Sequence, residues 1–381
     1  MNKKVGITSC GGYEFSDLYR AVREAAEQAG ELDVKGKRVL LKPNILFDAA
    51  PEKALTTHPV FLEAVIRLVK DSGADRVFVG DSPGIQKPGF AGKGCGLGPA
   101  AERAGAEWID FTEGKTEISL PSGKAVKRFT LSSIVKETDC IISLPKLKTH
   151  QLMFFTGAMK NLFGLVPSLL KSPYHVRFPG RRQFASMITD LNEAVMADYA
   201  FMDGITAMEG PGPSSGKPRH TGLVLASSNL LALDIAASAV IGYPPLDIPV
   251  NREALSRKIW LDDVSEIEYP GLVPNEIRIP DFEKIPVKKN ENQLLELILP
   301  RAYRKIREAL SPRPEVSGDI CVRCGDCIRI CGSGAMAFRE RDGKKSVHID
   351  YRKCIRCYCC HEICPAKAIE IRKALPFRSG V

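Results

Sequence analysis

The sequence predicts an α/β protein in which a mainly parallel-sheet domain precedes a small, cysteine-rich α+β unit. Over residues 1–285, short apolar runs alternate with helical patterns, as in folds where helices cover a parallel sheet. Residues 286–316 combine a helical pattern with the run Ser311-Pro312-Arg313-Pro314, which favours a connection between domains. Residues 317–372 then hold eight of the twelve cysteines at metal-ligand spacing, and a short basic tail covers 373–381.

The strands and helices of the first domain are expected from the period of the apolar residues. The stretch PVFLEAVIRLVKDS at 59–72, for example, is apolar at helical spacing and ends before Gly73. The expected strands are Val39–Leu41, Val77–Val79, Cys140–Leu144, Tyr199–Met202 and Leu223–Ala226. The expected helices are 59–72, 99–105, 184–199 and 228–241, and residues 243–290 are rich in proline and charge.

Composition limits the class of protein. A chain of 381 residues is long enough for two or three domains, and 44% hydrophobic with 26% charged residues is ordinary for a folded protein. No run of about 18 apolar residues predicts a membrane span, and the apolar stretch after Lys3-Lys4 is short for a signal peptide. We therefore expect a cytoplasmic protein without a membrane partner. The net charge of +9 favours an anionic partner, but no basic run interleaved with aromatic residues points to nucleic acid.

Two cysteine runs carry the clearest chemical signal. The first is Cys321-x2-Cys324-x2-Cys327-x3-Cys331, and the second is Cys354-x2-Cys357-x2-Cys360-x3-Cys364-Pro365. This spacing, present twice, is that of bacterial ferredoxins with two 4Fe–4S clusters, in which the fourth cysteine of each run ligates the other cluster. We therefore expect one cluster on Cys321, Cys324, Cys327 and Cys364, and a second on Cys354, Cys357, Cys360 and Cys331.

The sequence around the runs agrees with a two-cluster ferredoxin-like domain. Ala335–Arg339 and Ser346–Ile349 alternate like strands around Arg341-Asp342-Gly343, and Ala368–Arg372 is the matching strand of the second half. A zinc site built from CxxC pairs is the alternative, but such sites lack the longer run. Gly332 follows Cys331 where proline is usual, which loosens that turn without removing a ligand. Cys359, between two expected ligands, is interpreted as a packed thiol.

Polar residues follow the expected strands of the first domain. Lys42 and Asn44 follow the first, Asp81 the second, and Lys146, Lys148 and His150 the third. Asp203 and Glu209 follow Tyr199–Met202. Ligands of open α/β sheets bind outside the carboxyl ends of the strands, so we expect these loops to line one cleft.

At these residues the chain resembles the domain of unknown function 362 family. The segments that carry the resemblance are GKRVLLKPN, GDSPG, SLPKLKTH, TGAMKNLFGLVP and MDGITAMEGPGPSSGKP, which together cover roughly residues 3–245. The pairing of KLKTH with KNLFG is the most specific part. Members similar to this chain often carry a ferredoxin unit behind the domain. The resemblance implies the fold and the cleft, but the family name assigns no reaction.

Roles for the cleft residues follow from their chemistry. Lys42, Lys146, Lys148 and Lys160 are expected to bind carboxylate or phosphate groups, and Asn44 and Asn161 to add neutral hydrogen bonds. His150 is the candidate proton donor, because an imidazole titrates near neutral pH. Asp81, Asp203 and Glu209 are expected to orient lysines or to bind a metal or proton. Each position also has a structural interpretation, as a solvated lysine, a packed histidine or an aspartate that caps a turn.

Three functions fit these residues. The first is an iron–sulfur oxidoreductase that passes electrons from two 4Fe–4S clusters to an anionic substrate or cofactor in the cleft. The second is a non-enzymatic electron-delivery subunit for a partner enzyme, and the third is a maturation or reductive-activation factor for a partner protein. Residues 317–381 hold 13 Lys and Arg against 7 Asp and Glu, which favours an acidic electron donor such as a ferredoxin.

Overall fold

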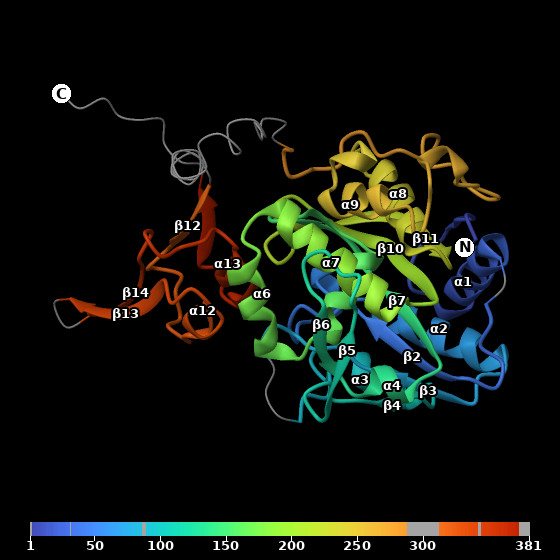
Figure 1. Ribbon diagram of the computed structural model, residues 1–381, viewed down its shortest axis with the longest axis horizontal. Coiled ribbons are helices and arrows are strands. Elements are labelled where there is room, and N and C mark those ends of the chain that lie inside the picture. The colour runs from blue at the N-terminus through green and yellow to red at the C-terminus, as the bar shows by residue number, and fades with distance from the viewer. Residues whose placement is uncertain (1, 31, 86–88, 288–311, 342–343, 373–381) are drawn as a thin grey trace. The chain divides into compact units, whose positions relative to one another are not determined.

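The computed structural model describes residues 2–30, 32–85, 89–287, 312–341 and 344–372. It contains two compact units, one formed by residues 1–171 with 180–285 and the other by 172–179 with 286–381 (Figure 1). The helical pattern expected within 286–316 falls mostly on residues 288–311, which lie outside the described residues, as does the basic tail at 373–381.

The first unit is built on a nine-stranded, mainly parallel sheet, which confirms the predicted fold class. The main path has the order β1-β11-β10-β7-β2-β3-β4, and β8 and β9 extend it beside β10. Neighbouring strands run parallel along the part of this path from β10 through β7, β2 and β3 to β4. In contrast, β11 pairs antiparallel with β1 and β10. The strands are β1 (Gly6–Ser9), β2 (Arg38–Pro43), β3 (Arg76–Val79), β4 (Glu107–Trp108), β7 (Cys140–Leu144), β8 (Lys146–His150), β9 (Phe154–Thr156), β10 (Tyr199–Glu209) and β11 (Lys217–Ser227).

The helices cover both faces of this sheet because its central strands are apolar on both sides. Val39 and Leu41 of β2 join one apolar cluster with α1, α2 and α3, whereas Ser143 of β7 bonds to the backbone of α5 on the other face. Helices α5, α7, α8 and α9 pack against one another (Figure 1). The helices of this unit are α1 (Phe15–Ala29), α2 (Pro59–Asp71), α3 (Leu97–Arg103), α4 (Ile134–Glu137), α5 (Ala158–Asn161), α7 (Arg181–Val195), α8 (Leu230–Val240) and α9 (Pro249–Arg257). Helix α6 (Lys171–Arg177) belongs to the second unit apart from its first residue.

Two segments expected to be loops are strands. Residues Lys146–His150 form β8, and β10 continues past Met202, so that Asp203 and Glu209 lie within a strand. The reason is long-range pairing: β11 runs antiparallel along β10 from Ala200 to Glu209, with a bulge after Gly204. A short separate hairpin is formed by β5 (Lys115–Ser119) and β6 (Arg128–Ser132).

The second unit contains two small antiparallel sheets around a core that includes Cys327 and Cys360, two of the expected cluster ligands. The hairpin of β13 (Met336–Arg341) and β14 (Lys344–Ile349) confirms the two strands predicted there, with residues 342 and 343 outside the described part. The strand expected at 368–372 is β15 (Ile369–Arg372), and its partner β12 (Arg313–Val316) falls in the segment predicted as a linker. Two short helices, α12 (Asp326–Arg329) and α13 (Cys359–Ile363), complete the unit.

None of the helices in the described part of the chain has the length and apolar character needed to cross a bilayer.

Candidate functional site

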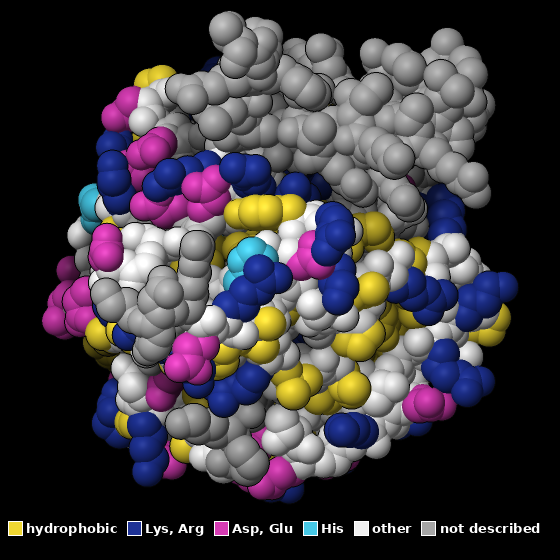
Figure 2. Space-filling view, turned by 90° about the vertical axis from the view of Figure 1, so that its left-hand side faces the viewer, with side chains coloured by type: hydrophobic (Ala, Val, Ile, Leu, Met, Phe, Trp, Pro, Cys, Tyr) yellow, Lys and Arg dark blue, Asp and Glu magenta, His cyan; other side chains and the backbone are white. Residues whose placement is uncertain are grey.

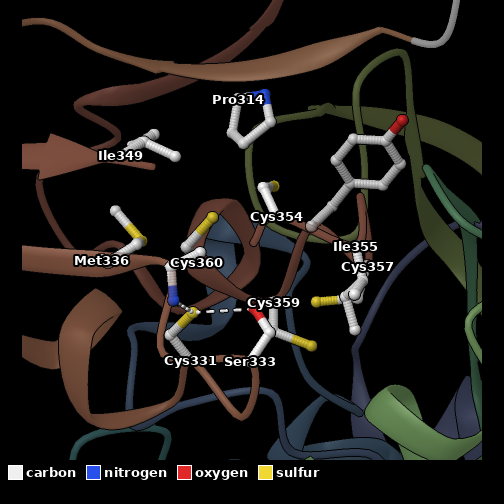
Figure 3. A pocket seen from close by; sticks show the side chains of 12 residues that line it. Pro314, Cys331, Ser333, Met336, Ile349, Cys354, Ile355, Cys357, Cys359 and Cys360 are labelled. Carbon is white, nitrogen blue, oxygen red and sulfur yellow. Dashed lines mark hydrogen bonds between the residues drawn. The ribbon is translucent and has the colours of Figure 1, made fainter. Parts of the chain in front are cut away.

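One cavity of the second unit is lined by four of the expected cluster ligands and by Cys359. The four expected ligands are Cys331, Cys354, Cys357 and Cys360, and the space measures about 340 Å³, part of which is open to solvent (Figure 3). Cys331 ends the first cysteine run, whereas the other three belong to the second run. The apolar wall includes Met336 and Ile349, drawn with the thiols in Figure 3.

The remaining four cysteines surround a second cavity of about 330 Å³. They are Cys321, Cys324, Cys327 and Cys364. Burial, followed by the three neighbouring thiols, raises the pKa of Cys327 to about 11, because a thiolate there would meet three other sulfurs. The grouping of the thiols is the one expected from the spacing, with the fourth cysteine of each run placed among three cysteines of the other run.

The two halves of this unit repeat the same backbone 33 residues apart. The offset relates each cysteine of the first run to one of the second: Cys321 to Cys354, Cys324 to Cys357, Cys327 to Cys360 and Cys331 to Cys364. Three backbone positions with positive φ recur at the same offset, and non-glycine residues adopt this conformation rarely. The pairs are Arg323 and Arg356 (56° and 59°), Gly325 and Tyr358 (81° and 64°), and Gly334 and Lys367 (62° and 53°).

Backbone hydrogen bonds to sulfur follow the same repeat. The Ala335 N–H donates to Cys331 Sγ and the Ala368 N–H donates to Cys364 Sγ, each at 3.2 Å. A donor aimed at a sulfur stabilises the thiolate, which is the form that binds metal. The backbone therefore favours the thiolate form of Cys331 and of Cys364 in the same way, and each is the fourth cysteine of its run.

The shape of the thiol sets fits a cluster better than a single ion. Within the described residues, no three His, Cys, Asp or Glu side chains are close enough together to hold one metal ion. Eight thiols divided between two wide cavities instead fit cuboidal clusters, which are larger than one zinc ion. Cys359 also borders the first cavity, but a hydrogen bond to Cys357, followed by burial, holds its pKa well above the usual value. Burial also raises the pKa of Cys360, an expected ligand, so the interpretation of Cys359 as a packed thiol rests on the spacing alone.

In the first unit, candidate residues gather where the strand order reverses. From β2 the chain adds β3 and β4 on one side of the sheet, whereas β7 lies on the other side of β2. Ligands of open α/β sheets bind in the crevice that such a reversal leaves at the carboxyl ends of the strands. Lys42 near the end of β2 and Lys146 just after β7 both lie at this edge.

Lys42 and Asp81 form a buried ion pair at the ends of β2 and β3. Lys42 Nζ lies 2.7 Å from Asp81 Oδ1, and the two side chains are 0% and 2% exposed. Lys42 also donates to the Pro43 carbonyl oxygen at 2.7 Å and to Asn161 Oδ1 at 3.1 Å. Asn44 Nδ2 donates to the same Asn161 oxygen at 3.1 Å. Burial lowers the pKa of Lys42, and Asp81 opposes that shift.

Gly164 of the KNLFG segment packs directly against this ion pair. A Cβ atom at this position would lie 2.0 Å from Asp81 Oδ1 and 2.4 Å from Lys42 Nζ. Any side chain here would therefore displace one of the two charged groups. Position 164 is therefore occupied by glycine, because the ion pair of Lys42 and Asp81 fills the space that a side chain would take.

Lys171 is a site residue that the sequence reasoning missed. Its buried ammonium group donates to the Ser82 carbonyl oxygen. Burial lowers the pKa of Lys171 to about 7; Asp81 opposes the shift, and the charges of Lys42 and Lys160 add to it. The charges of Asp81, Lys42 and Lys160 thus all act on Lys171, which places a second buried lysine near the ion pair of Lys42 and Asp81. No motif marked Lys171, because the stretch around it, VPSLLKSPYH at 166–175, follows none of the expected strands.

A second buried pair joins β8 to β10. Lys146 Nζ lies 2.8 Å from Asp203 Oδ2, with side chains 1% and 0% exposed, and the two residues are register partners. Lys146 also donates to the Tyr13 hydroxyl at 2.9 Å, and that hydroxyl donates to Asp203 Oδ1 at 2.9 Å. The His58 ring stacks on Tyr13 with centroids 3.5 Å apart. The backbone N–H of His58 donates to Asp203 Oδ2 at 2.9 Å, so three groups from distant parts of the sequence share this carboxylate.

Tyr13 and His58 are the other residues that sequence reasoning missed. Burial lowers the pKa of His58 to about 4, and Lys146 adds to this shift, so the ring is neutral at pH 7. Burial and Asp203 raise the pKa of the Tyr13 hydroxyl, which keeps its proton. One signal in the sequence could have marked His58: it stands just before Pro59, where the helical pattern begins. In the structure its Nδ1 caps α2 by accepting from the Val60 N–H.

The remaining predicted residues bond elsewhere. Lys148 donates to the Leu55 carbonyl oxygen at 2.7 Å, and His150 Nδ1 accepts from the N–H groups of Leu152 and Met153. Glu209 accepts from the Glu283 N–H at 3.0 Å. The expected single cleft is thus two centres, one at Lys42 with Asn44, Asp81 and Asn161, and one at Lys146 with Asp203.

Comparison with known families decides the identity of the first unit. A family model described as a domain of unknown function, DUF362, matches residues 39–239, which is more than half of the chain. The chain belongs to the DUF362 family. The matched region of this DUF362 protein runs from β2 to α8 and contains Lys42, Asp81, Lys146 and Asp203. A second model, described as a 4Fe-4S dicluster domain, matches residues 320–368 and covers the eight cysteines at metal-ligand spacing, so the second unit is an iron–sulfur domain.

Similar proteins extend the comparison without adding a reaction. A thylakoid-associated protein of Synechocystis is 31% identical over 291 residues, covering 75% of this chain and 88% of that protein. The lactate racemase apoprotein of Thermoanaerobacterium thermosaccharolyticum is 16% identical with a TM-score of 0.40, covering 59% of this chain and 54% of that one. A protein of Thermotoga maritima is 13% identical with a TM-score of 0.36, covering 56% and 55%. The chain spans about half the length of each solved protein.

Proposed function

We propose that this DUF362 protein transfers electrons through two 4Fe–4S clusters. One is held by Cys321, Cys324, Cys327 and Cys364, and the other by Cys331, Cys354, Cys357 and Cys360. The single observation that supports this is the sorting of eight thiols into two cavities, each with three cysteines from one run and one from the other. When bound, such clusters supply electrons one at a time.

We further propose that the chain is an oxidoreductase whose anionic substrate or cofactor binds at the Lys42 centre. The presence of two buried lysines, Lys42 and Lys171, near the carboxylate of Asp81 supports binding of carboxylate or phosphate groups. Lys171 would donate the proton that accompanies reduction, because an ammonium group with a pKa of about 7 can both give and regain a proton near neutral pH. Asn44 and Asn161 would orient the anion.

The roles predicted for Lys146, Lys148 and His150 remain proposals. Lys146 has acceptors in Asp203 and Tyr13, Lys148 in a backbone carbonyl, and His150 Nδ1 is occupied by two backbone donors. A substrate would have to replace these partners before it met the groups. Lys42 is paired in the same way, so we place substrate binding at the Lys42 centre because a second buried lysine, Lys171, lies near it, and we assign a positioning role to the Lys146 centre.

The same internal pairing favours a second candidate function. A buried lysine whose hydrogen bonds are satisfied by protein acceptors stabilises the fold without any ligand. In that case the first unit would serve as a docking platform, and the protein would be an electron-delivery subunit or a reductive-activation factor for a partner protein. An enzyme is distinguished from both by a small molecule that reoxidises the reduced clusters.

For a partner, we propose an acidic electron donor such as a ferredoxin. The net charge of residues 317–381 is positive, and Figure 2 shows Lys and Arg side chains on one face together with Asp, Glu and hydrophobic side chains. Such a surface attracts an acidic protein at low ionic strength. A cytoplasmic location stays a prediction from the sequence.

The cluster proposal is tested on anaerobically purified protein. We expect about eight iron and eight sulfide per chain, and an EPR signal of interacting reduced clusters after dithionite. Cys331→Ser is expected to lose about half of the iron, because it removes a ligand of one cluster. Four or fewer iron atoms in the wild type, or zinc in their place, would refute the proposal.

The substrate proposal is tested by reoxidation. Reduced protein is mixed anaerobically with carboxylated and phosphorylated metabolites while cluster absorbance is followed. We expect one class to reoxidise the clusters, and Lys171→Gln to slow this by at least about tenfold. The matched control is Lys217→Gln, a lysine whose side chain is 75% exposed in a surface ion pair. Full iron content without any response would favour the electron-delivery function, and equal rates in both variants would remove Lys171 from the mechanism.

A further inference from the structure

One buried carboxylate of the first unit has no part in the proposed mechanism. Asp234 belongs to α8 and is 2% exposed. Its Oδ1 accepts from the Ala158 N–H at 2.6 Å, and its Oδ2 accepts from the Met159 N–H at 3.1 Å. On the other side, Asn192 Nδ2 of α7 donates to the Met159 carbonyl oxygen at 2.9 Å. Side chains of two helices therefore hold α5, a single turn that begins at Ala158.

Gly157 leaves the space that the Asp234 carboxylate fills. A Cβ atom at position 157 would overlap all three atoms of the Asp234 carboxyl group. The φ of Gly157 is −113°, which any residue can adopt, so this glycine provides space and not a special backbone conformation. A side chain here would push the carboxylate away from the two N–H donors of α5.

The turn held by Asp234 carries Asn161 into the Lys42 centre. Asn161 Nδ2 donates to the Lys42 carbonyl oxygen at 3.0 Å and to Ser143 Oγ at 3.1 Å, while its Oδ1 accepts from Lys42 Nζ. The Asn161 N–H donates to the Gly157 carbonyl oxygen at 3.0 Å, which closes the turn. A single turn has few hydrogen bonds of its own, so its position depends on the groups that bind its ends.

We propose that Asp234 is the positioning residue of the Lys42 centre: its ionised carboxylate holds α5 so that Asn161 stays bonded to Lys42, and a proton on that carboxylate releases the turn. The inference rests on the substrate site proposed above and adds that this site is complete only while Asp234 is ionised. A protonated carboxyl group accepts hydrogen bonds more weakly than a carboxylate, and its O–H is a donor that the N–H groups of α5 cannot satisfy.

The surroundings of Asp234 place this change near neutral pH. Burial raises the pKa of Asp234 to about 7, and the N–H donors of Ala158 and Met159 oppose the shift. Helices α5 and α9, strands β10 and β11 and the 3₁₀ turn Pro245–Asp247 pack against α8. Charged or titratable residues on these elements include Lys160, Asp203, His220, Asp247 and Glu253. Within the described part of the chain none of them acts on the Asp234 carboxylate, so its charge has no buried counter-ion.

The test follows hydrogen exchange of the full-length protein by mass spectrometry from pH 8 to pH 6, with each rate corrected for intrinsic exchange at that pH. We expect the protection of residues 158–162 to fall at least about tenfold over this range, with a midpoint near 7, while α2 changes less than about twofold. The wild-type series needs no variant. Protection of 158–162 that does not respond to pH would overturn the proposal.

Two variants assign the response to Asp234. Asp234→Asn should abolish it, because the amide group does not ionise. The matched control is Asp48→Asn: Asp48 also accepts from two consecutive N–H groups, those of Gly94 and Cys95, but it is exposed. The control should keep the wild-type response at 158–162. A response that survives in Asp234→Asn, or that is lost in Asp48→Asn, would remove Asp234 from this role.

A second measurement follows the Lys42 centre itself. The side-chain amide of Asn161 gives a ¹⁵N signal that is assigned with Asn161→Ala, and Asn161 does not titrate. We expect this signal to shift with the same midpoint as the exchange at α5, and to lose that shift in Asp234→Asn. A change in exchange without a shift at Asn161 would show that Asp234 holds α5 without positioning the centre, which would also overturn the proposal.

Unfolding separates this role from that of a plain hydrogen-bond acceptor. Between about 3.8 and 7 the folded state binds the extra proton of Asp234, so its ionisation lowers stability as pH rises. Asp234→Asn escapes that loss, and its guanidinium unfolding constant should fall up to about tenfold relative to wild type from pH 6 to pH 8. An equal deficit at both pH values would mark a plain acceptor and refute the proposal.

These measurements need no substrate, so the two proposals can fail separately. A pH response at α5 and Asn161 without any metabolite that reoxidises the clusters would support the role of Asp234 and count against the substrate site. Reoxidation by a metabolite without a pH response at α5 would do the opposite.

Discussion

Replacing Asp81 by Asn tests whether the ion pair at the end of β2 is as buried as the structure shows. The change keeps the size of the side chain and removes the charge that faces Lys42 Nζ at 2.7 Å. Because neither side chain is more than 2% exposed, water cannot take the place of the lost carboxylate. Lys42 must then either keep an unpaired buried charge or release its proton.

The expected cost follows from that burial. Removing one partner of a buried ion pair costs about 3–5 kcal/mol, out of a total stability of about 5–15 kcal/mol for a typical domain. Lys42→Met should cost a similar amount, because it leaves the Asp81 charge buried. The double variant should lose less than the sum of the two, by about 1–3 kcal/mol, because no unpaired charge remains.

Tryptophan fluorescence provides a selective assay. Both tryptophans, Trp108 and Trp260, lie in the first unit, so guanidinium unfolding followed at their emission reports that unit separately from the iron–sulfur domain. The control is Glu107→Gln, which breaks an ion pair with Arg76 whose side chains are 54% and 57% exposed. That loss should stay below about 1 kcal/mol.

The pH dependence has a definite sign. Burial lowers the pKa of Lys42 below its usual 10.5, and Asp81→Asn removes the group that opposes this shift. Between the folded and unfolded pKa values the unfolded chain binds more protons, so the stability of the variant should rise with pH toward 10.5. A loss no larger than that of Glu107→Gln, or additive losses in the double variant, would refute a buried, coupled pair.

Three further predictions concern other features. Gly164→Ala should cost about 1–3 kcal/mol in the same fluorescence assay, because its Cβ would contact the buried ion pair, and a neutral result would show that the pair can move aside. Burial lowers the pKa of His58 to about 4, so the unfolded state binds the extra proton and stability should fall as pH drops from about 6.5 to 4. His58→Gln should flatten that dependence, and an unchanged slope would contradict it. Arg356, whose Nε and Nη1 are shielded from solvent without a hydrogen-bond partner among the described residues, should raise the potential of the nearby cluster. Arg356→Gln should lower one midpoint potential by about 40 mV, the equivalent of roughly 1 kcal/mol for one electron, in an EPR-monitored titration. The exposed counterpart Arg323→Gln should shift a potential less, and equal shifts would disprove the assignment.

The sequence was sufficient for β2, β3, β7, β10 and β11 of the sheet and for the grouping of the thiols, but not for β1, β4, β8 and β9. Apolar runs such as Cys140–Leu144 are buried along their whole length, so their composition alone marks them as central strands. The spacing of the cysteines determines the geometry of the cluster loops, because three thiols at intervals of three residues can surround one cavity only in a few conformations, and the fourth, four residues later, then lies at the other cavity.

The partners of the lysines could not be predicted, because they depend on long-range pairing. Lys146 meets Asp203 only because β8 joins β10 in one particular register. Tyr13 and His58 reach the same carboxylate from loops far apart in the sequence. The same pairing turned two expected loops into strands and buried side chains that the sequence placed in an open cleft.

The exchange of fourth cysteines between the two halves has a consequence for assembly. Each cluster would join positions from both runs, so that each metal centre acts as a cross-link between the first half and the second. Neither half could then hold a complete set of ligands alone, and folding of the unit would be coupled to delivery of iron and sulfide. Oxygen damage at one cluster would remove a link between the halves and expose the apolar residues beneath it. Iron supply would thus control not only the redox activity of this unit but also its lifetime in the cell.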